Sequence, residues 1–229
     1  MPYARIDAAD DHEFATKATV LLSKQIQFFI KEHGNCLIGL SGGSTPKPVY
    51  QMLAKEKGID WGRVTLFLVD DRYVPSTHED SNQHLVRTTL LQHLHVQRHV
   101  IFPHTHLPLE ECVTNYDERL SEVLIKDTAD IVVLGMGDDG HIASLFPPVT
   151  EEAFEPELFA IHTTTERFNV RDRISVTLPV LVKSKMSVFL LKGEEKQRVW
   201  DTMISDKRDS RRWPAQSVLA EERSFAVIG

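Results

Sequence analysis

Short, almost wholly apolar runs alternate along the chain with segments in which apolar residues recur every three or four positions. Runs that are apolar at successive positions are typical of strands buried on both faces of a sheet. The sequence predicts such strands at residues 36–40, 64–69 and 131–134, and further strands at 173–178, 187–191 and 225–228.

Helical periodicity fills the intervals between these runs. A three-to-four-residue spacing of apolar positions indicates a helix that packs one face on a core. The faces are traced by Phe14, Ala18, Leu21, Leu22, Ile26 and Phe29, then Val49, Met52 and Leu53, then Leu85, Thr89, Leu90 and Leu94, then Val113, Tyr116, Leu120 and Leu124, with a further helix over 194–204. Alternating strands and helices predict an α/β fold, a doubly wound, mostly parallel sheet with helices on both faces in a Rossmann-like arrangement. We expect one domain over residues 1–229.

Composition and charge argue against several classes of partner but do not indicate a function. The chain has 229 residues, a formal charge of −7 and no block of Lys and Arg, which disfavours a nucleic-acid or anionic-membrane partner. No apolar run reaches the length of a membrane span, and the first residues are polar and acidic. We therefore expect a cytosolic protein with no membrane partner. Cys36 and Cys112 lie in apolar stretches and are interpreted as buried free thiols.

Ligands of doubly wound sheets bind where strands end, so we expect the site to lie in the loops after strands. The first loop, residues 41–46, contains two glycines that let the backbone approach a ligand. Ser44 and Thr45 are expected to cap a helix that begins at Pro46, and such an N-terminus can bind phosphate. Gly42, Gly43, Ser44 and Thr45 are thus candidate phosphate ligands, although an ordinary glycine-rich turn explains the pattern equally well. The loop lacks the Lys of a P-loop.

The same loop matches a second pattern. Gly39, Ser41 and Gly43 have the spacing of the nucleophile elbow of serine hydrolases. Only one predicted strand precedes it, whereas those enzymes usually place several strands earlier. A nucleophilic Ser41 is therefore a minority alternative.

The second loop begins with Asp70, Asp71 and Arg72. Carboxylates at a strand end are costly unless they pair or bind something. The guanidinium of Arg72 can hold a phosphate or a developing oxyanion, while a surface salt bridge is the alternative. Downstream, Ser81 and Asn82 are expected to cap a helix.

The third loop reads Gly-Met-Gly-Asp-Asp-Gly-His over residues 135–141. Its glycines match the dinucleotide fingerprint, but Asp138 and Asp139 would put negative charge where a pyrophosphate must lie. We therefore predict no dinucleotide cofactor. Asp139 can instead orient the ring of His141 and stabilise its protonated form, which suits general-base chemistry. A turn in which His141 only caps the next element is the structural alternative.

A metal site is not expected. The chain has eleven histidines, but none forms the spaced pair beside a Glu that zinc enzymes use. We expect a cluster of five to be mostly exposed to solvent, namely His93, His95, His99, His104 and His106.

The three loops, in this order and spacing, resemble the family that comprises 6-phosphogluconolactonases and glucosamine-6-phosphate deaminases. The resemblance runs from about Phe14 to the C-terminus. The segments that carry it are residues 40–46, 70–75 with 80–82, 135–147, 173–179 and 193–196. The deaminase branch has an Asn-Glu pair after its Gly-His and lacks the Arg of the second loop. Here Ser144 to Pro147 and Arg72 take those places, which favours the lactonase branch.

The resemblance implies hydrolysis of 6-phospho-D-glucono-1,5-lactone to 6-phospho-D-gluconate, a step of the pentose phosphate pathway, with no cofactor and no metal. His141 would be the base, Asp139 would orient it, and Arg72 would hold the oxyanion or the phosphate. Substrate-binding residues would be Gly42, Gly43, Ser44, Thr45, Asp70, Arg173 and Lys196. Asp71 replaces the usual Glu of the family and is given no catalytic role. The expected partner is the small phosphorylated sugar lactone alone, and the oligomeric state is not predicted. A deaminase-type enzyme and a non-catalytic sugar-phosphate sensor are the alternatives.

Overall fold

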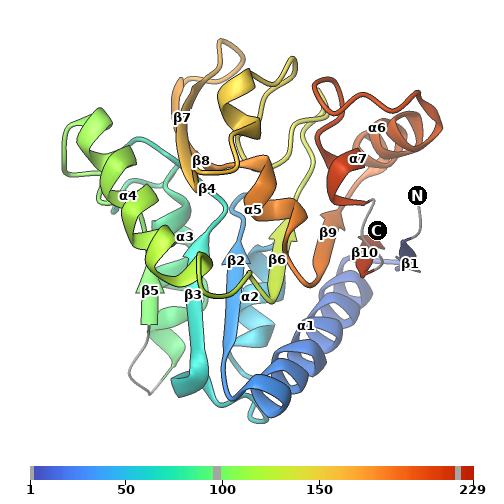
Figure 1. Cartoon of the computed structure of the whole chain (residues 1–229). Coiled ribbons are helices and arrows are strands. Elements are labelled where there is room, and N and C mark those ends of the chain that lie inside the picture. The colour runs from blue at the N-terminus through green and yellow to red at the C-terminus, as the bar shows by residue number, and fades with distance from the viewer. Residues whose placement is uncertain (1–2, 95–98, 220–222) are drawn as a thin grey trace.

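The computed structural model of the chain describes residues 3–94, 99–219 and 223–229. Within these residues seven strands form a central sheet in the order β1-β10-β9-β6-β2-β3-β5, and every neighbouring pair is parallel (Figure 1). The strands are β1 (Ala4–Asp7), β2 (Cys36–Leu40), β3 (Val64–Leu68), β5 (His99–Ile101), β6 (Ile131–Leu134), β9 (Ser187–Leu191) and β10 (Ser224–Ile228). The predicted parallel α/β sheet is confirmed.

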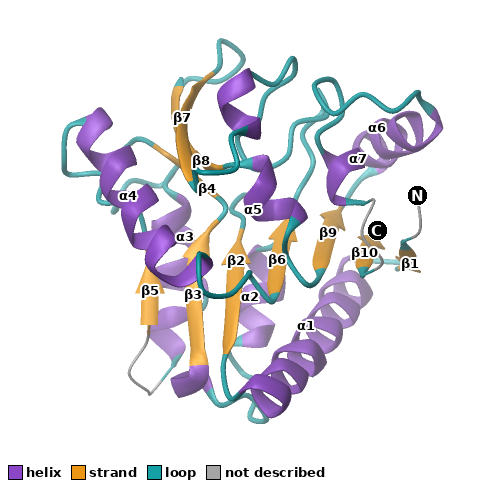
Figure 2. Ribbon diagram, in the orientation of Figure 1, coloured by secondary structure: helices purple, strands orange, loops and turns teal. Residues whose placement is uncertain are grey.

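Helices cover both faces of this sheet. One face carries α1 (Asp11–His33), α2 (Lys47–Leu53) and α3 (Asn82–Thr89), and the other carries α4 (Leu109–Leu124), α5 (Leu178–Val182), α6 (Glu194–Ser205) and α7 (Ala215–Val218). In Figure 2, α4 and α5 lie in front of the strands and α2 and α3 behind them. Side chains alternate between the two cores: Val132 of β6 packs with α4, and Val133 packs with α1.

A second sheet was not predicted. It is antiparallel, has the order β4-β8-β7, and consists of β4 (Asp70–Arg72), β8 (Asp172–Val176) and β7 (Ala160–Thr164). It lies above the carboxyl ends of β2 and β3 (Figure 1). The predicted strand at 173–178 is confirmed as β8, but it pairs in this antiparallel sheet and not in the parallel one. Residues 173–178 alternate polar and apolar side chains, a pattern that indicates a strand but does not say which sheet it joins.

Val69 joins the two sheets. Its N–H donates to the carbonyl of Leu40 at the end of β2 (3.0 Å), and its carbonyl accepts from the N–H of Val176 in β8 (2.9 Å). Ile174 and Val176 belong to the same hydrophobic cluster as Val132. The small sheet is thus continuous with one of the two cores.

N-terminal caps were predicted for two helices, α2 and α3. Ser81 caps α3, because its Oγ accepts from the N–H of His84 at 3.3 Å. The predicted cap of α2 is wrong: this helix begins at Lys47, and neither Ser44 nor Thr45 caps it. Its cap position is held by Pro46, which carries no side-chain oxygen.

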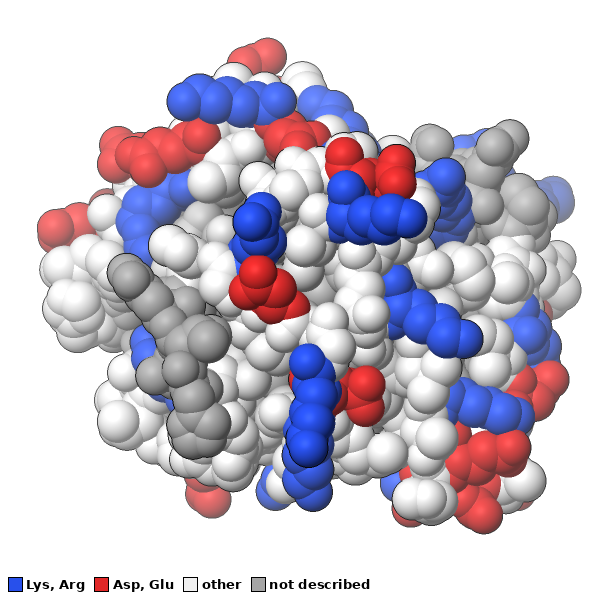
Figure 3. Space-filling model, turned by 90° about the horizontal axis from the view of Figure 1, so that it is seen from below, with Lys and Arg blue, Asp and Glu red and all other residues white. Residues whose placement is uncertain are grey.

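Cys36 and Cys112 are buried and free. Among the described residues, no helix combines the length and the apolar character that crossing a membrane requires. Figure 3 shows the face at the amino ends of the strands, where Lys and Arg side chains are interspersed with Asp and Glu and no broad basic surface is seen among the coloured residues.

Candidate active site

The carboxyl ends of β2, β3, β6 and β9 border an open cavity of about 360 Å³. Chain connections leave the sheet in opposite directions on the two sides of the β2–β6 pair, which is where doubly wound sheets bind ligands. The cavity brings together seven of the predicted site residues, namely Gly42, Gly43, Asp70, Arg72, His141, Arg173 and Lys196. Ser44 and Thr45 are not among its lining residues.

His141 and Asp139 form a hydrogen-bonded pair at one wall. The Nδ1 atom of His141 lies 2.5 Å from Oδ1 of Asp139, and the backbone N–H of His141 donates to the same oxygen at 3.1 Å. Both side chains are largely buried, with 17% and 14% of their surfaces exposed. Because Asp139 occupies Nδ1, the ring offers Nε2 to a substrate or a water molecule.

Asp139 is a carboxylate at neutral pH. Burial alone would raise its pKa, but the hydrogen bonds and charge of His141, with a smaller contribution from Arg167, lower it to about 2. The negative charge therefore stays beside the imidazole and stabilises its protonated form.

The glycines of the 135–141 loop shape this pair. The N–H of Gly137 donates to the carbonyl of His141 at 2.9 Å, which folds the loop back on itself. A Cβ atom at position 137 would lie 2.2 Å from two atoms of the His141 ring. The glycine is required so that the imidazole can pack on the backbone. This requirement explains why the glycine spacing of the loop matches the dinucleotide fingerprint without a dinucleotide-binding role.

Asp71 has a structural role. It is completely buried, and its Oδ1 accepts from the backbone N–H groups of Arg72 (2.8 Å) and Asn82 (2.6 Å). Burial raises its pKa to about 6. It does not line the cavity, and it fixes the start of α3 against β4.

Asn82 is a site residue that sequence reasoning missed. Its Oδ1 accepts from Nη1 of Arg72 (2.9 Å), and its Nδ2 donates to the carbonyl of Asp70 (2.8 Å). A Cβ on Gly42 would lie 1.7 Å from Oδ1 of Asn82, so the first loop needs glycine there. From the sequence, Asn82 was expected to cap a helix and to belong to a segment that carries the family resemblance. It had no predicted role in the site, because nothing in the local pattern shows that α3 points at the first loop.

Three cations face the cavity. Arg72, Arg173 and Lys196 have no carboxylate within ion-pair distance among the described residues, although Nε of Arg173 donates to the carbonyl of Val170 at 3.0 Å. Burial lowers the pKa of Arg173, with a further lowering by the charge of Arg72, and burial also lowers the pKa of Lys196. The Nε of Arg72 is buried without a hydrogen-bond partner. Unpaired cations around a cavity favour an anionic ligand.

Ser41 lies at the edge of this cavity, and its Oγ is buried without a hydrogen-bond partner. A serine nucleophile needs a base within hydrogen-bond reach, and none contacts this hydroxyl. We expect Ser41→Ala to keep kcat close to the wild-type value, because the hydroxyl it removes makes no bond. Steady-state kinetics, with a fluorophosphonate probe as a second readout, would measure this. Stoichiometric labelling of Ser41 with loss of activity would contradict it.

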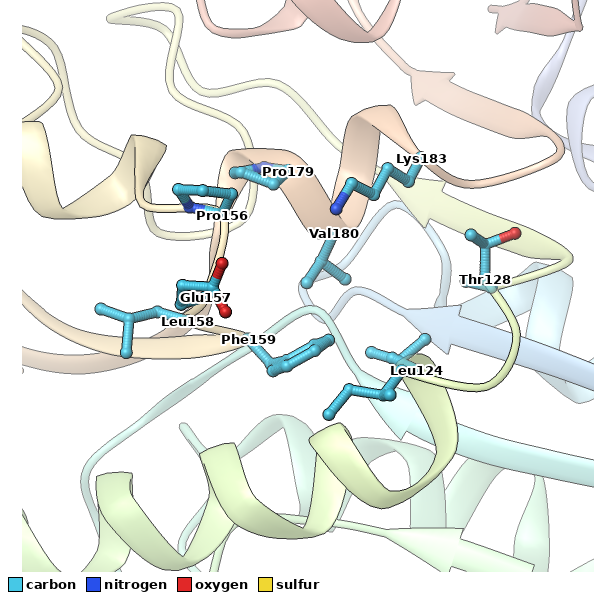
Figure 4. A pocket seen from close by; sticks show the side chains of 11 residues that line it. Leu124, Thr128, Pro156, Glu157, Leu158, Phe159, Pro179, Val180 and Lys183 are labelled. Carbon is cyan, nitrogen blue, oxygen red and sulfur yellow. The ribbon is translucent and has the colours of Figure 1, made fainter.

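A second cavity, of about 290 Å³, lies at the end of α4 beside α5 (Figure 4). Its lining is mostly apolar, with Leu124, Phe159 and Val180 bordering it, and its charged members are Glu157 and Lys183. Its lining contains no His, Cys or Ser side chain.

In the described ranges, no three His, Cys, Asp or Glu side chains converge as a metal site would need. His93, His99, His104 and His106 are exposed, as expected, and His95 lies outside the described residues.

The family model described as glucosamine-6-phosphate isomerases/6-phosphogluconolactonase matches residues 9–227. The chain belongs to this family. A relative in the isomerase/lactonase family, the probable 6-phosphogluconolactonase of Dictyostelium discoideum, is 38% identical over 215 residues, which cover 92% of this chain and 91% of that protein. The 6-phosphogluconolactonase of Pseudomonas aeruginosa is 33% identical over 202 residues, covering 83% and 80%. The crystal structure of 6-phosphogluconolactonase from Thermotoga maritima aligns with a TM-score of 0.88 at 26% identity and covers 99% of both chains.

Proposed function

We propose that residues 1–229 act as one domain that hydrolyses 6-phospho-D-glucono-1,5-lactone to 6-phospho-D-gluconate. The observation that carries this proposal is a His141–Asp139 pair beside a cavity lined by three cations that have no ion-pair partner in the described part of the chain. A base beside an anion-binding wall is what hydrolysis of a phosphorylated lactone requires. The names of the relatives and the near-complete overlap with the Thermotoga enzyme support the same substrate.

In the proposed reaction, Nε2 of His141 takes a proton from a water molecule, whose oxygen bonds to the lactone carbonyl carbon. The negative charge of Asp139 stabilises the imidazolium that forms. The bond from that carbon to the ring oxygen then breaks, and the ring oxygen receives the proton from His141. A carboxylic acid and a hydroxyl result, and the acid ionises at neutral pH.

Other residues of the cavity lining would bind the charged parts of the substrate. Arg173 and Lys196, with the backbone of Gly42 and Gly43, are proposed to hold the phosphate. Arg72 is fixed by Asn82 and by the carbonyl of Asp80 (2.8 Å), so it offers a cation of set position for the oxyanion or the phosphate. Ser44, Thr45 and Asp70 stay predicted ligands. Asp70 is the acceptor of a 2.7 Å hydrogen bond from Ser144.

Lys196→Ala is expected to raise KM several-fold with a smaller effect on kcat, because it removes a proposed phosphate-binding cation and leaves the His141–Asp139 pair in place. The matched control is Lys192→Ala, which removes a lysine close by in sequence that pairs with Asp11 outside the cavity. Initial rates over a range of lactone concentrations give both constants. An unchanged KM for Lys196→Ala would remove this residue from the phosphate site.

The decisive experiment is acid release from freshly prepared 6-phosphogluconolactone, with the His141→Asn protein as the blank for spontaneous hydrolysis. We propose a reaction without a metal, so dialysis against EDTA should leave the rate unchanged. Ammonia release from glucosamine 6-phosphate, measured in parallel, should be absent. Ammonia release without lactone hydrolysis would assign the protein to the deaminase branch, and binding without turnover of either would make it a sensor.

A further inference from the structure

The loop between β7 and β8, residues 165–171, crosses the base-bearing wall of the cavity. From this loop Nη2 of Arg167 lies 3.0 Å from Oδ2 of Asp138, and its Nε lies 3.4 Å from Oδ2 of Asp139. The two carboxylate oxygens of Asp139 therefore have different partners: Oδ1 is hydrogen-bonded to His141, and Oδ2 faces Arg167. This arginine reaches the pair from an element that is remote in sequence and belongs to the other sheet.

The next residue of the loop contacts the same site. Phe168 has its ring centre 6.1 Å from that of His141, and the guanidinium carbon of Arg173 lies 5.3 Å from the centre of the Phe168 ring. Phe168 is 41% exposed, which is unusual for a large apolar side chain, and it lines the cavity. The loop thus touches both the base and one of the cations.

The loop has a defined conformation. Its ends are joined by a hydrogen bond from the N–H of Thr165 to the carbonyl of Arg171 (3.2 Å), and the N–H of Arg167 donates to Oγ1 of Thr165 (3.2 Å). Below it, β7 and β8 pair over their full length. Arg167 is held over the two aspartates by its own hairpin.

We propose that Arg167 is a positioning residue for the His141–Asp139 pair. Its guanidinium fixes the carboxylate so that Oδ1 faces Nδ1 of His141, and its charge offsets part of the negative charge that the imidazole experiences. The inference rests on the proposed function, in which His141 is the base. A base that is held too strongly in its protonated form is inactive, so a cation on the far side of Asp139 keeps the imidazole free to accept a proton.

Other charged groups surround the pair. Arg212, from the segment before α7, donates to the backbone carbonyl of Asp139 (2.7 Å) and does not contact its carboxylate. The remaining charged groups that face the cavity are Asp138 on the same loop as Asp139, Glu195 and Lys196 of α6, and Asp70, Arg72 and Arg173 across the cavity. Among the described residues, Arg167 is the cation whose ion pair reaches the Asp139 carboxylate.

The test compares Arg167→Gln with Arg171→Gln. The control removes the same charge from the same loop, at a residue whose partner is the exposed Glu166. In Arg167→Gln the imidazolium is favoured, so the acid limb of the kcat/KM profile should move to higher pH by about 0.2–0.5 pH unit, a size typical of a half-exposed ion pair. Asp139, with its pKa near 2, does not titrate in that range. Loss of the fixed carboxylate should lower kcat on the order of tenfold.

A second readout does not depend on turnover. The ring signals of His141, assigned by comparison with the His141→Asn protein, can be titrated by NMR in the ligand-free enzyme, and their midpoint should move upward in Arg167→Gln and not in Arg171→Gln. Arg167→Lys should restore most of the wild-type profile. The proposal is overturned if Arg167→Gln and Arg171→Gln share one profile and one midpoint, including the case in which both lose activity equally. If wild-type protein fails to hydrolyse the lactone, the proposed function fails, while the NMR midpoint still decides whether Arg167 acts on His141.

Discussion

Replacing His141 with Asn should lower kcat on 6-phosphogluconolactone by about 10²–10⁴-fold, the usual contribution of a general base, and leave KM close to the wild-type value. Asparagine keeps a polar side chain of similar size beside Asp139 but cannot accept a proton from water. The substitution does not change the cationic side chains that are proposed to bind the substrate, so binding should persist.

The structure offers a matched control for this variant. His162 of β7 also pairs with a carboxylate, its Nε2 lying 2.9 Å from Oδ1 of Asp172, but it does not line the cavity. His162→Asn should therefore hydrolyse the lactone at nearly the wild-type rate. Rates must be corrected for spontaneous ring opening. Near-normal turnover by His141→Asn would show that another group activates the water.

Gly137→Ala should cause a loss of kcat on the order of 10²-fold, although only one carbon is added. The new Cβ would lie 2.2 Å from Cε1 and Nδ1 of His141 and 2.8 Å from Oδ1 of Asp139, so the ring and the carboxylate cannot keep their positions. A displacement of about 1 Å in a catalytic group is enough for a loss of this size.

Gly135→Ala is the control, since a Cβ at that position would meet no atom within 4 Å. Both variants should be compared by kcat, and their thermal melting curves should show whether each is folded. Equal losses of activity in the two variants would indicate general damage to the loop. Full activity in Gly137→Ala would mean that the ring does not need its observed position.

Much of the fold could be predicted because the central strands are apolar on both faces. Residues 36–40, 131–134 and 187–191 coincide with β2, β6 and β9, and the predicted strand at 64–69 runs one residue beyond β3. The rule that ligands bind at strand ends then located the three loops of the cavity. The small sheet could not be predicted, because the alternation of residues 173–178 indicates a strand but not its partners, and β4 has only three residues. β1 and β5 have only four and three residues, too short to show a pattern.

The site residues likewise fall into those that could be predicted from the sequence and those that could not. Asp139 could be paired with His141 from sequence because the two lie in one tight loop. Arg167 and Phe168 could not, since they reach the base only after β7 and β8 fold back above the main sheet. Ser44 and Thr45 were placed by a helix cap that does not form, because Pro46 holds the cap position.

The position of Val69 determines which parts of the cavity can move. Its N–H is bonded to one sheet and its carbonyl to the other, and Asp70 and Arg72 follow directly in the chain. The wall that carries these two side chains therefore has no hinge: to displace it, backbone hydrogen bonds of both sheets would have to break together. The β7–β8 loop is tied down mainly by exposed side chains and one closing hydrogen bond. The side of the cavity that carries Arg167 and Phe168 is thus held by fewer backbone hydrogen bonds than the side that carries Asp70 and Arg72.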